Sequence, residues 1–174
     1  MFAGKVFALY RTQVVLPDGG RQMYESIVSP DVVRVYPVTA AGVLLMIDEF
    51  RGEVCEPVLR VVSGQIGGHE TPGEAAAREL SEELGYRAES LVLFATSTAN
   101  LALESTIHHV LATDLRSGRR RLERGEDVTV RPVALGDIEA LVWSGAVRED
   151  VIALNLLRLV RIHRDMYASE RESA

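Results

Sequence analysis

Hydrophobic and polar residues alternate along the first third of the chain, as they do in strands that bury one face. Two such stretches, 5–16 and 22–28, flank the sequence Pro17-Asp18-Gly19-Gly20, whose composition is typical of a tight turn. We therefore predict a β-hairpin in this segment. Further strands are predicted at residues 32–38, 42–48 and 59–62.

Helices are predicted in three longer segments. Residues 73–84 are rich in Ala, Leu, Glu and Arg, and residues 136–143 and 149–166 are also predicted to be helical. The remaining predictions are strands at 90–95, 106–113 and 128–133 and a polar loop at 117–127. Because strands come first and then recur between helices, we expect an α/β fold with a mixed sheet between helical layers.

The helix predicted at residues 73–84 has clear start and stop signals. Thr71 can cap it, Pro72 can occupy its first position, and Glu74 stands three residues after the cap. Gly85 follows the helical run and can end it. The boundaries of this helix are therefore predicted from local sequence.

Two faces of this helix differ in chemistry. An apolar stripe that includes Leu80 and Leu84 can dock on a core, while Glu79, Glu82 and Glu83 lie at i, i+3 and i+4 on another face. Like charges placed so close together repel one another unless a cation offsets them, and Mg²⁺ or Mn²⁺ prefers such oxygen ligands. An exposed, solvated acidic face is the alternative interpretation.

The wider stretch from residue 64 to residue 86 has a fixed spacing of Gly, Glu and Arg. It reads Gly64, five residues, Glu70, seven residues, Arg78-Glu79-Leu80, one residue, Glu82-Glu83, one residue, Gly85-Tyr86. This stretch resembles the Nudix box, the signature of the Nudix hydrolase superfamily, and only Tyr86 is bulkier than the usual aliphatic residue. The resemblance implies an α/β/α sandwich and metal-assisted hydrolysis of a pyrophosphate.

The resemblance also implies roles for the acidic residues. Glu79 and Glu83 would bind the metal, Mg²⁺ or Mn²⁺, and Glu82 would share the metal cluster or bind water. The backbone carbonyl of Ser63, just before the box glycine, would complete the protein ligands. We expect Glu79, Glu82 and Glu83 to be catalytic residues in this sense.

Arg78 and Glu70 resemble the family's internal pair, in which the arginine fork orients the glutamates of the metal helix. Joining the loop to the helix is their purely structural role, and the two roles are compatible. His69, at a variable position of the box, is interpreted as a loop residue.

Residues 35–64 are similar to the ADP-ribose pyrophosphatase branch of the superfamily, in which a strand ends in an aromatic residue and an arginine before the box. Phe50-Arg51 fills that place. The similarity implies that Arg51 contacts the substrate diphosphate or terminal ribose phosphate, and a solvated surface arginine is the alternative. In this branch the opening hairpin often completes a homodimer, so we predict that residues 1–30 lie at a dimer contact.

Two segments depart from that branch. The loop after the box commonly has a Ser-Pro-Gly-like turn and then a glutamate, whereas this chain has Thr98-Ala99-Asn100 leading to Glu104. Glu104 is nevertheless a candidate substrate contact, with a solvated loop carboxylate as the alternative. Arg60 stands where the branch usually has a glutamate, which replaces a carboxylate with a cation near the box.

Hydrolysis also requires a base that activates water. In this branch a glutamate from the loop before the last strand can serve, and the loop 119–127 offers Glu123 and Glu126. If neither reaches the site, Glu82 is the alternative, because clustered carboxylates can raise one pKa. The cationic run Arg119-Arg120-Arg121 opens the same loop and is either a phosphate contact or a solvated face.

Composition narrows the class of partner. The chain has 174 residues, which suits one domain over 1–174, with an unstructured tail expected at 168–174. A net charge of −6 argues against a broad surface for nucleic acid or anionic membrane, so a small nucleotide is the expected partner. The single cysteine, Cys55, and the lack of a signal peptide or membrane-length apolar run favour the cytoplasm.

The function predicted from these observations is metal-dependent hydrolysis of a nucleoside diphosphate sugar, with ADP-ribose cleaved to AMP and ribose 5-phosphate. Within the enzyme class, a nucleoside triphosphate or dinucleoside polyphosphate substrate is the alternative. From another class, a non-catalytic nucleotide-sugar sensor is the alternative, because fold does not fix function.

Overall fold

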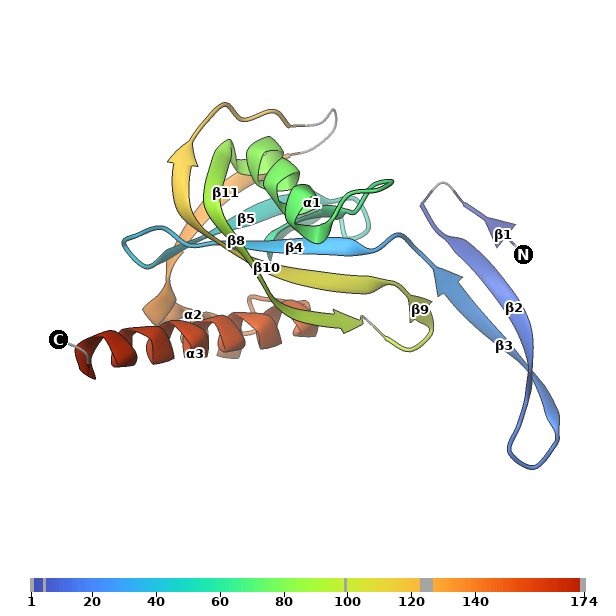
Figure 1. Ribbon diagram of the computed structural model, residues 1–174. Helices are drawn as coiled ribbons and strands as arrows, with labels where there is room; N and C mark the ends of the chain where they lie inside the picture. The colour runs from blue at the N-terminus through green and yellow to red at the C-terminus, as the bar shows by residue number, and fades with distance from the viewer. Residues whose placement is uncertain (1, 5, 99, 123–126, 173–174) are drawn as a thin grey trace.

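The described part of the chain forms three β-sheets. The computed structural model covers residues 2–4, 6–98, 100–122 and 127–172 (Figure 1). The first sheet has the order β1-β2-β3-β9, with β1 (Phe2–Ala3), β2 (Ala8–Val15), β3 (Arg21–Val28) and β9 (Leu103–Glu104). The second has the order β7-β4-β10-β8, with β7 (Val62–Gln65), β4 (Val32–Pro37), β10 (Thr106–Ser117) and β8 (Tyr86–Thr98). The third has the order β11-β5-β6, with β11 (Val128–Ala134), β5 (Val43–Arg51) and β6 (Glu56–Arg60).

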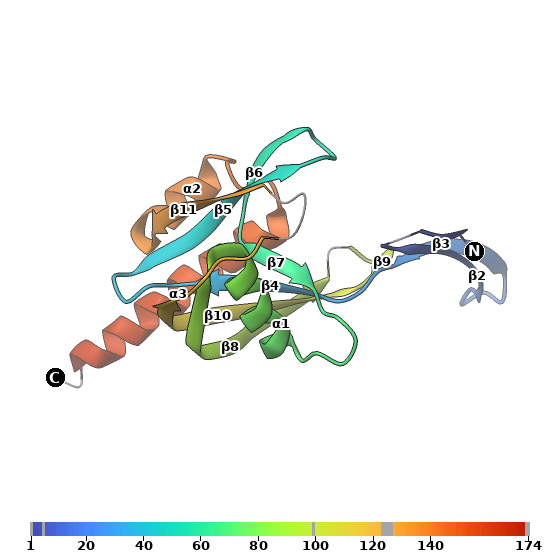
Figure 2. The same cartoon turned by 90° about the horizontal axis from the view of Figure 1, so that it is seen from above.

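Helices cover both sides of these strands. The helical segments are α1 (Pro72–Glu79), a π-helical turn (Leu80–Leu84), a 3₁₀ turn (Leu135–Asp137), α2 (Ile138–Trp143) and α3 (Asp150–Glu172). In Figures 1 and 2, α1 lies on one side of β4 and β10, and α2 and α3 lie on the other. The second sheet is mixed, because β4 runs parallel to β10 and antiparallel to β7. The predicted α/β fold with a mixed sheet between helical layers is confirmed.

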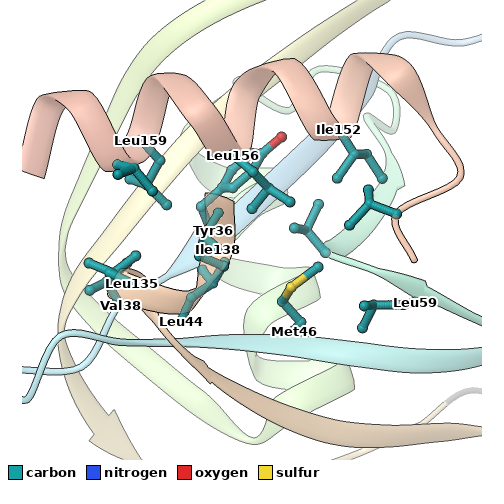
Figure 3. Packing of buried hydrophobic residues seen from close by; sticks show 13 residues of the cluster. Tyr36, Val38, Leu44, Met46, Leu59, Leu135, Ile138, Ile152, Leu156 and Leu159 are labelled. Carbon is teal, nitrogen blue, oxygen red and sulfur yellow. The ribbon is translucent and has the colours of Figure 1, made fainter. Parts of the chain in front are cut away.

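Alternating side chains of β4 and β5 build two separate hydrophobic cores. Val33 and Val35 of β4 pack with residues of α1, whereas Tyr36 packs with residues of α2 and α3. In β5, Leu44 and Met46 belong to the same core as Tyr36, which lies under α2 and α3. Figure 3 shows this core beneath α3, where Leu156 and Leu159 point toward the strands. The period of two in these strands therefore assigns successive residues to opposite layers.

The segment predicted as one strand at 59–62 divides between two sheets. β6 pairs with β5 up to Arg60, and β7 pairs with β4 from Val62 onward. Val61 joins them and belongs to the core under α3, whereas Val62 belongs to the core under α1. The chain therefore changes sheets just before Gly64.

The predicted N-terminal hairpin is present and extends away from the helical body (Figures 1 and 2). β2 and β3 pair from Ala8↔Val28 to Val15↔Arg21, and Gly19 adopts a positive φ of 84° in the turn. Several large apolar side chains on these strands are exposed: Leu9, Tyr10, Val14, Val15, Met23 and Tyr24.

Both predicted C-terminal helices are present, with different ends. The segment 136–143 begins as a 3₁₀ turn and continues as α2. α3 extends to Glu172, so residues 168–172, which we predicted to be an unstructured tail, are helical. Residues 173–174 lie outside the described residues. Within the described ranges, no helix combines the length and the apolar character needed to span a bilayer.

Candidate functional site: the acidic helix and its loops

The acidic helix begins as its sequence predicts. Glu74 N donates to Thr71 Oγ1 at 3.2 Å, and Thr71 N donates to Glu74 Oε2 at 2.8 Å. These two bonds form a capping box around the first turn, in which Pro72 is the first helical residue. Leu80 and Leu84 are buried, so the predicted apolar stripe does face the core. At the other end, Gly85 takes the left-handed conformation with φ of 72°.

The last turn of this helix differs from the prediction, because residues 80–84 form a π-helical turn. Glu82 and Glu83 lie on this turn, whereas Glu79 ends the α-helical part. A π-turn shifts the following side chains around the axis relative to a regular helix, and such turns are frequent at functional sites. The regular i, i+3, i+4 geometry predicted for the three glutamates is therefore replaced by a wider turn.

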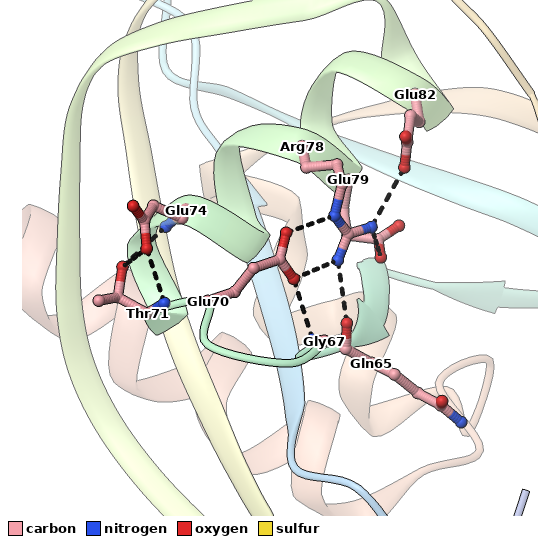
Figure 4. A network of polar contacts seen from close by, with 8 residues as sticks. All are labelled: Gln65, Gly67, Glu70, Thr71, Glu74, Arg78, Glu79 and Glu82. Atoms are coloured by element: carbon pink, nitrogen blue, oxygen red, sulfur yellow. Dashed lines mark hydrogen bonds and ion pairs between the residues drawn. The ribbon is translucent and has the colours of Figure 1, made fainter.

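Arg78 connects the loop to the helix through its guanidinium group (Figure 4). Its Nε and Nη2 donate to the two carboxylate oxygens of Glu70 at 2.8 and 2.9 Å, which is a bidentate fork. Its Nη1 donates to Glu79 Oε1 at 2.6 Å and approaches Glu82 Oε2 at 3.2 Å. One arginine therefore holds the loop carboxylate and two helix carboxylates, as the resemblance implied.

The electrostatics of this fork favour the charged forms. The bonds from Arg78, together with the Gly67 N–H, lower the pKa of Glu70 to about 2. The same carboxylate, followed by Glu79, raises the pKa of Arg78. The ion pair is therefore fully charged at neutral pH.

Two nearly buried glutamates lie against strand β7 at Ser63 and Gly64. Glu79 and Glu83 are 8% and 5% exposed, and Ser63 N donates to Glu83 Oε1 at 3.4 Å. A Cβ on Gly64 would lie 1.7 Å from Glu79 Oε1, so the carboxylate occupies space that a glycine leaves. The box glycine is required here by this close approach.

The oxygen atoms of the box glutamates and of the Ser63 carbonyl fit a divalent cation that also binds water or substrate oxygens. Carboxylate and carbonyl oxygens are the ligands that Mg²⁺ and Mn²⁺ prefer. Among the described residues, no group of three His, Cys, Asp or Glu side chains converges closely enough to hold a metal by itself. Glu79, Glu82 and Glu83, which we expected to form one cluster, therefore do not make a closed three-carboxylate site among the described residues. Mg²⁺ in proteins commonly takes one or two carboxylates and completes its shell with water and phosphate oxygens.

The two predicted substrate residues lie on different sheets. Arg51 ends β5, is half-buried, and donates to Glu49 Oε1 at 3.0 Å and Glu53 Oε1 at 2.7 Å. It lines a pocket of about 280 Å³ with Arg60 and other residues of the β5–β6 hairpin and with the two residues just before α3. Glu104 is exposed on β9, which pairs with β3 of the hairpin sheet. Glu123 and Glu126, the predicted bases, lie outside the described residues.

Arg60 has a structural role that its sequence context did not indicate. Its Nε donates to Glu149 Oε1 at 2.7 Å and its Nη1 donates to Glu49 Oε2 at 2.6 Å, in a mostly buried position. Glu149 also accepts from Arg34. Burial alone would raise the pKa of Glu149, but the two guanidinium groups outweigh it and lower that pKa. The cation in place of the usual glutamate is therefore paired within the fold.

The arginine run 119–121 does not form a uniform solvated face. The Arg120 side chain is partly buried and donates to the backbone carbonyls of Glu83 and Val128. Arg119 and Arg121 are exposed. Sequence reasoning missed this contact because nothing local separates the three arginines.

A comparison with protein-family models matches the NUDIX domain over residues 28–153. The chain belongs to the Nudix family. The matched segment contains the loop, the acidic helix and the strands that position them, so the predicted membership is confirmed.

Individual relatives of this Nudix chain have more specific names. It is 34% identical over 150 residues to an ADP-ribose pyrophosphatase of Bacillus subtilis (strain 168), which covers 84% of this chain and 81% of that protein. It is 30% identical over 166 residues to a methanol dehydrogenase activator of Bacillus methanolicus, covering 91% and 89%. An ADP-ribose pyrophosphatase of Mycobacterium tuberculosis (strain ATCC 25618 / H37Rv) is 27% identical over 161 residues, covering 90% and 78%.

Among solved structures, the Nudix chain is similar to the crystal structure of an ADP compounds hydrolase. The TM-score is 0.80 at 25% identity, and the match covers 91% of this chain and 88% of that one. The predicted likeness to the ADP-ribose pyrophosphatase branch is confirmed by these relatives and this neighbour.

Proposed function

We propose that this Nudix protein hydrolyses the diphosphate linkage of a nucleoside diphosphate sugar, with ADP-ribose cleaved to AMP and ribose 5-phosphate. The observation that supports this most strongly is the placement of Glu79 and Glu83, two nearly buried carboxylates held against Ser63 and Gly64 of strand β7. The substrate class is supported by the relatives named ADP-ribose pyrophosphatase and by the structural neighbour named ADP compounds hydrolase.

A divalent metal, Mg²⁺ or Mn²⁺, is the cofactor in this proposal. Glu79 and Glu83 would hold it with the carbonyl of Ser63, and Glu82 would bind it or a water beside it. When bound, the metal would neutralise the diphosphate and activate water. The buried acids fit this role because removing carboxylates from water is unfavourable unless a cation or hydrogen bonds compensate.

Arg78 would keep the carboxylates in position while the substrate binds. Its fork on Glu70 fixes the position of the guanidinium group. The hydrogen bonds from its Nη1 to Glu79 and Glu82 then limit how those two side chains rotate. Because Glu82 lies at the longer distance of 3.2 Å, it is the glutamate most easily released from Arg78. Glu82 is accordingly our alternative base to Glu123 and Glu126.

The substrate would lie between Arg51 and Glu104. Arg51 lines a pocket beside the β5–β6 hairpin, and Glu104 belongs to the hairpin sheet. A nucleotide sugar has a charged diphosphate for the arginine and a second sugar for the carboxylate. A nucleoside triphosphate has no second sugar for that carboxylate. A nucleoside triphosphate and a dinucleoside polyphosphate remain the alternative substrates.

The hairpin would also form a homodimer. Its exposed apolar residues would otherwise leave an unprotected surface and edge, and pairing with a second copy is one way to cover them. Sedimentation at concentrations above those of the assay should show a dimer that Met23→Glu converts to monomer. Leu154→Glu on α3 is the matched control, because the two side chains are 47% and 50% exposed. A monomeric wild-type protein would refute this part of the proposal.

The substrate assignment is tested by comparing specificity constants. ADP-ribose, GDP-mannose and ATP are assayed under one metal condition, with both products identified. We expect ADP-ribose to be among the better substrates and to yield AMP and ribose 5-phosphate. In the cell, the proposed location of this reaction is the cytoplasm. A clear preference for ATP, with release of inorganic pyrophosphate, would refute the substrate class and leave the family unchanged.

The metal assignment is tested by Glu83→Gln, which keeps the side-chain size and removes its negative charge. We expect most activity to be lost while thermal stability is retained. Wild-type turnover of this variant at saturating Mg²⁺ would refute the metal site. A protein that binds ADP-ribose without cleaving it under any metal condition would instead be a sensor.

A further inference from the structure

The C-terminal end of the acidic helix is held by a segment from elsewhere in the chain. The last carbonyl groups of a helix have no partner within the helix and must find one elsewhere. Arg121 N donates to Glu82 O at 3.1 Å, and Gly118 N donates to Gly85 O at 2.6 Å. The Arg120 side chain donates through Nε to Glu83 O. Residues 118–121 therefore supply donors to three carbonyls at the end of the π-turn.

Arg120 also connects this end of the helix to a strand. Its Nη2 donates to the carbonyl of Val128, the first residue of β11. Val128 pairs with Glu49 of β5, so β11 is fixed in the third sheet. A planar guanidinium with fixed donor directions can hold two carbonyls at a defined separation, which a flexible ammonium group cannot do equally well. The cation also interacts favourably with the negative end of the helix dipole.

Gly85 lets the two segments approach this closely. A Cβ on Gly85 would lie 2.7 Å from Arg120 N and 3.0 Å from Arg120 Cα, which are backbone atoms. The same residue has a positive φ of 72°, which a side chain would strain. The glycine at this position of the box is therefore needed for the contact with residue 120 as well as for the helix end.

We propose that Arg120 is a positioning residue for the metal site. By fixing the carbonyl of Glu83 to β11, it sets the direction in which the π-turn presents the Glu82 and Glu83 carboxylates. This inference rests on the proposed function, since it requires those carboxylates to bind the metal. The Arg120 side chain contacts the backbone of the turn through hydrogen bonds and acts through the two glutamates.

The test compares Arg120→Ala and Arg120→Lys with Arg121→Ala. Arg121 is the matched control, because its side chain is exposed and its backbone N–H bond to Glu82 remains in the variant. Mn²⁺ binding to each protein is measured from the electron paramagnetic resonance signal of free Mn²⁺. The metal concentration for half-maximal hydrolysis of ADP-ribose is measured in parallel, and thermal unfolding gives the folded fraction.

We expect Arg120→Ala to weaken Mn²⁺ binding by about tenfold or more, as is typical when a group that supports a metal ligand is removed. KM for ADP-ribose at saturating metal should stay within about twofold, while turnover falls. Arg120→Lys should be intermediate, and millimolar guanidinium should partly restore Arg120→Ala. Arg121→Ala should match the wild type.

Two other outcomes would overturn the inference and differ in what they imply. If Glu83→Gln weakens Mn²⁺ binding but Arg120→Ala lowers only the folded fraction, Arg120 has a structural role and the proposed metal site stands. If Glu83→Gln binds Mn²⁺ as the wild type does, the proposed metal site itself is wrong, and the positioning role is lost with it.

Discussion

His109 makes the stability of this protein depend on pH. The imidazole is fully buried, with Nδ1 2.9 Å from Tyr36 Oη and Nε2 2.8 Å from Ser97 Oγ. Burial, followed by the positive charges of Arg34 and Arg158, lowers its pKa to about 4. The ordinary value in an unfolded chain is about 6.5.

The sign and size of the effect follow from these two pKa values. Between about pH 6.5 and pH 4 the unfolded chain carries a proton on this histidine and the folded protein does not. The free energy of unfolding therefore falls as pH falls, by about 1.4 kcal/mol per pH unit within that window, and the effect levels off below about pH 4. From about pH 7.5 to pH 4.5 the expected loss is about 2 to 3 kcal/mol, a large part of the stability of a typical domain.

The assay is urea unfolding of the wild type and His109→Gln at several pH values across this range. Glutamine keeps polar atoms beside Tyr36 and Ser97 but does not titrate. We expect the variant to be less stable at pH 7.5, because the buried packing is altered, and to lose about 2 to 3 kcal/mol less on acidification. His69→Gln, in an exposed loop, is the control and should follow the wild type. Parallel curves for the wild type and His109→Gln would refute the reasoning.

Three further predictions concern the acidic helix and the residues that contact it. Gly64→Ala should weaken Mn²⁺ binding by about tenfold, because the new Cβ would displace the Glu79 carboxylate, and an unchanged binding isotherm would contradict this. Thr71→Ala should lower the free energy of unfolding by about 1 kcal/mol in urea titrations and leave turnover at saturating metal unchanged, since it removes only the helix cap. Glu70→Gln should be less stable than the wild type above about pH 4.3, and this difference should narrow as pH falls toward 2, because the pKa of Glu70 is lowered to about 2 in the folded state. An equal difference in unfolding midpoint at pH 6 and pH 2.5 would show that the charge on Glu70 is not involved.

Features with partners close in sequence could be predicted. The cap of the acidic helix depends on Thr71 and Glu74, which are three residues apart, so their pairing is visible in the sequence. The pairing of Arg78 with Glu70 spans eight residues and was implied by the resemblance to the Nudix box. The hairpin followed from alternation on both sides of a turn whose composition is distinctive.

Features that depend on distant partners could not be predicted. Arg60 was interpreted as a departure from the branch, yet its partner Glu149 is 89 residues away, and no local pattern connects them. The contact between Arg120 and the Glu83 carbonyl spans 37 residues. The π-turn was also missed, because a regular helix and a π-turn have the same residue preferences until tertiary contacts widen the last turn.

The change of sheet at Val61 separates two parts of the molecule that could otherwise constrain each other. The register of β7 is set by β4, which pairs Arg34 with Ser63 and Val33 with Gly64. The turn at residues 52–55 belongs to the β5–β6 hairpin in the other sheet. Insertions or deletions in that turn would therefore leave Ser63 and Gly64 in place beneath the acidic helix. During divergence, such a chain can lengthen or reshape the hairpin that bears Arg51, and so acquire new specificities, while its hydrolytic machinery is inherited unchanged.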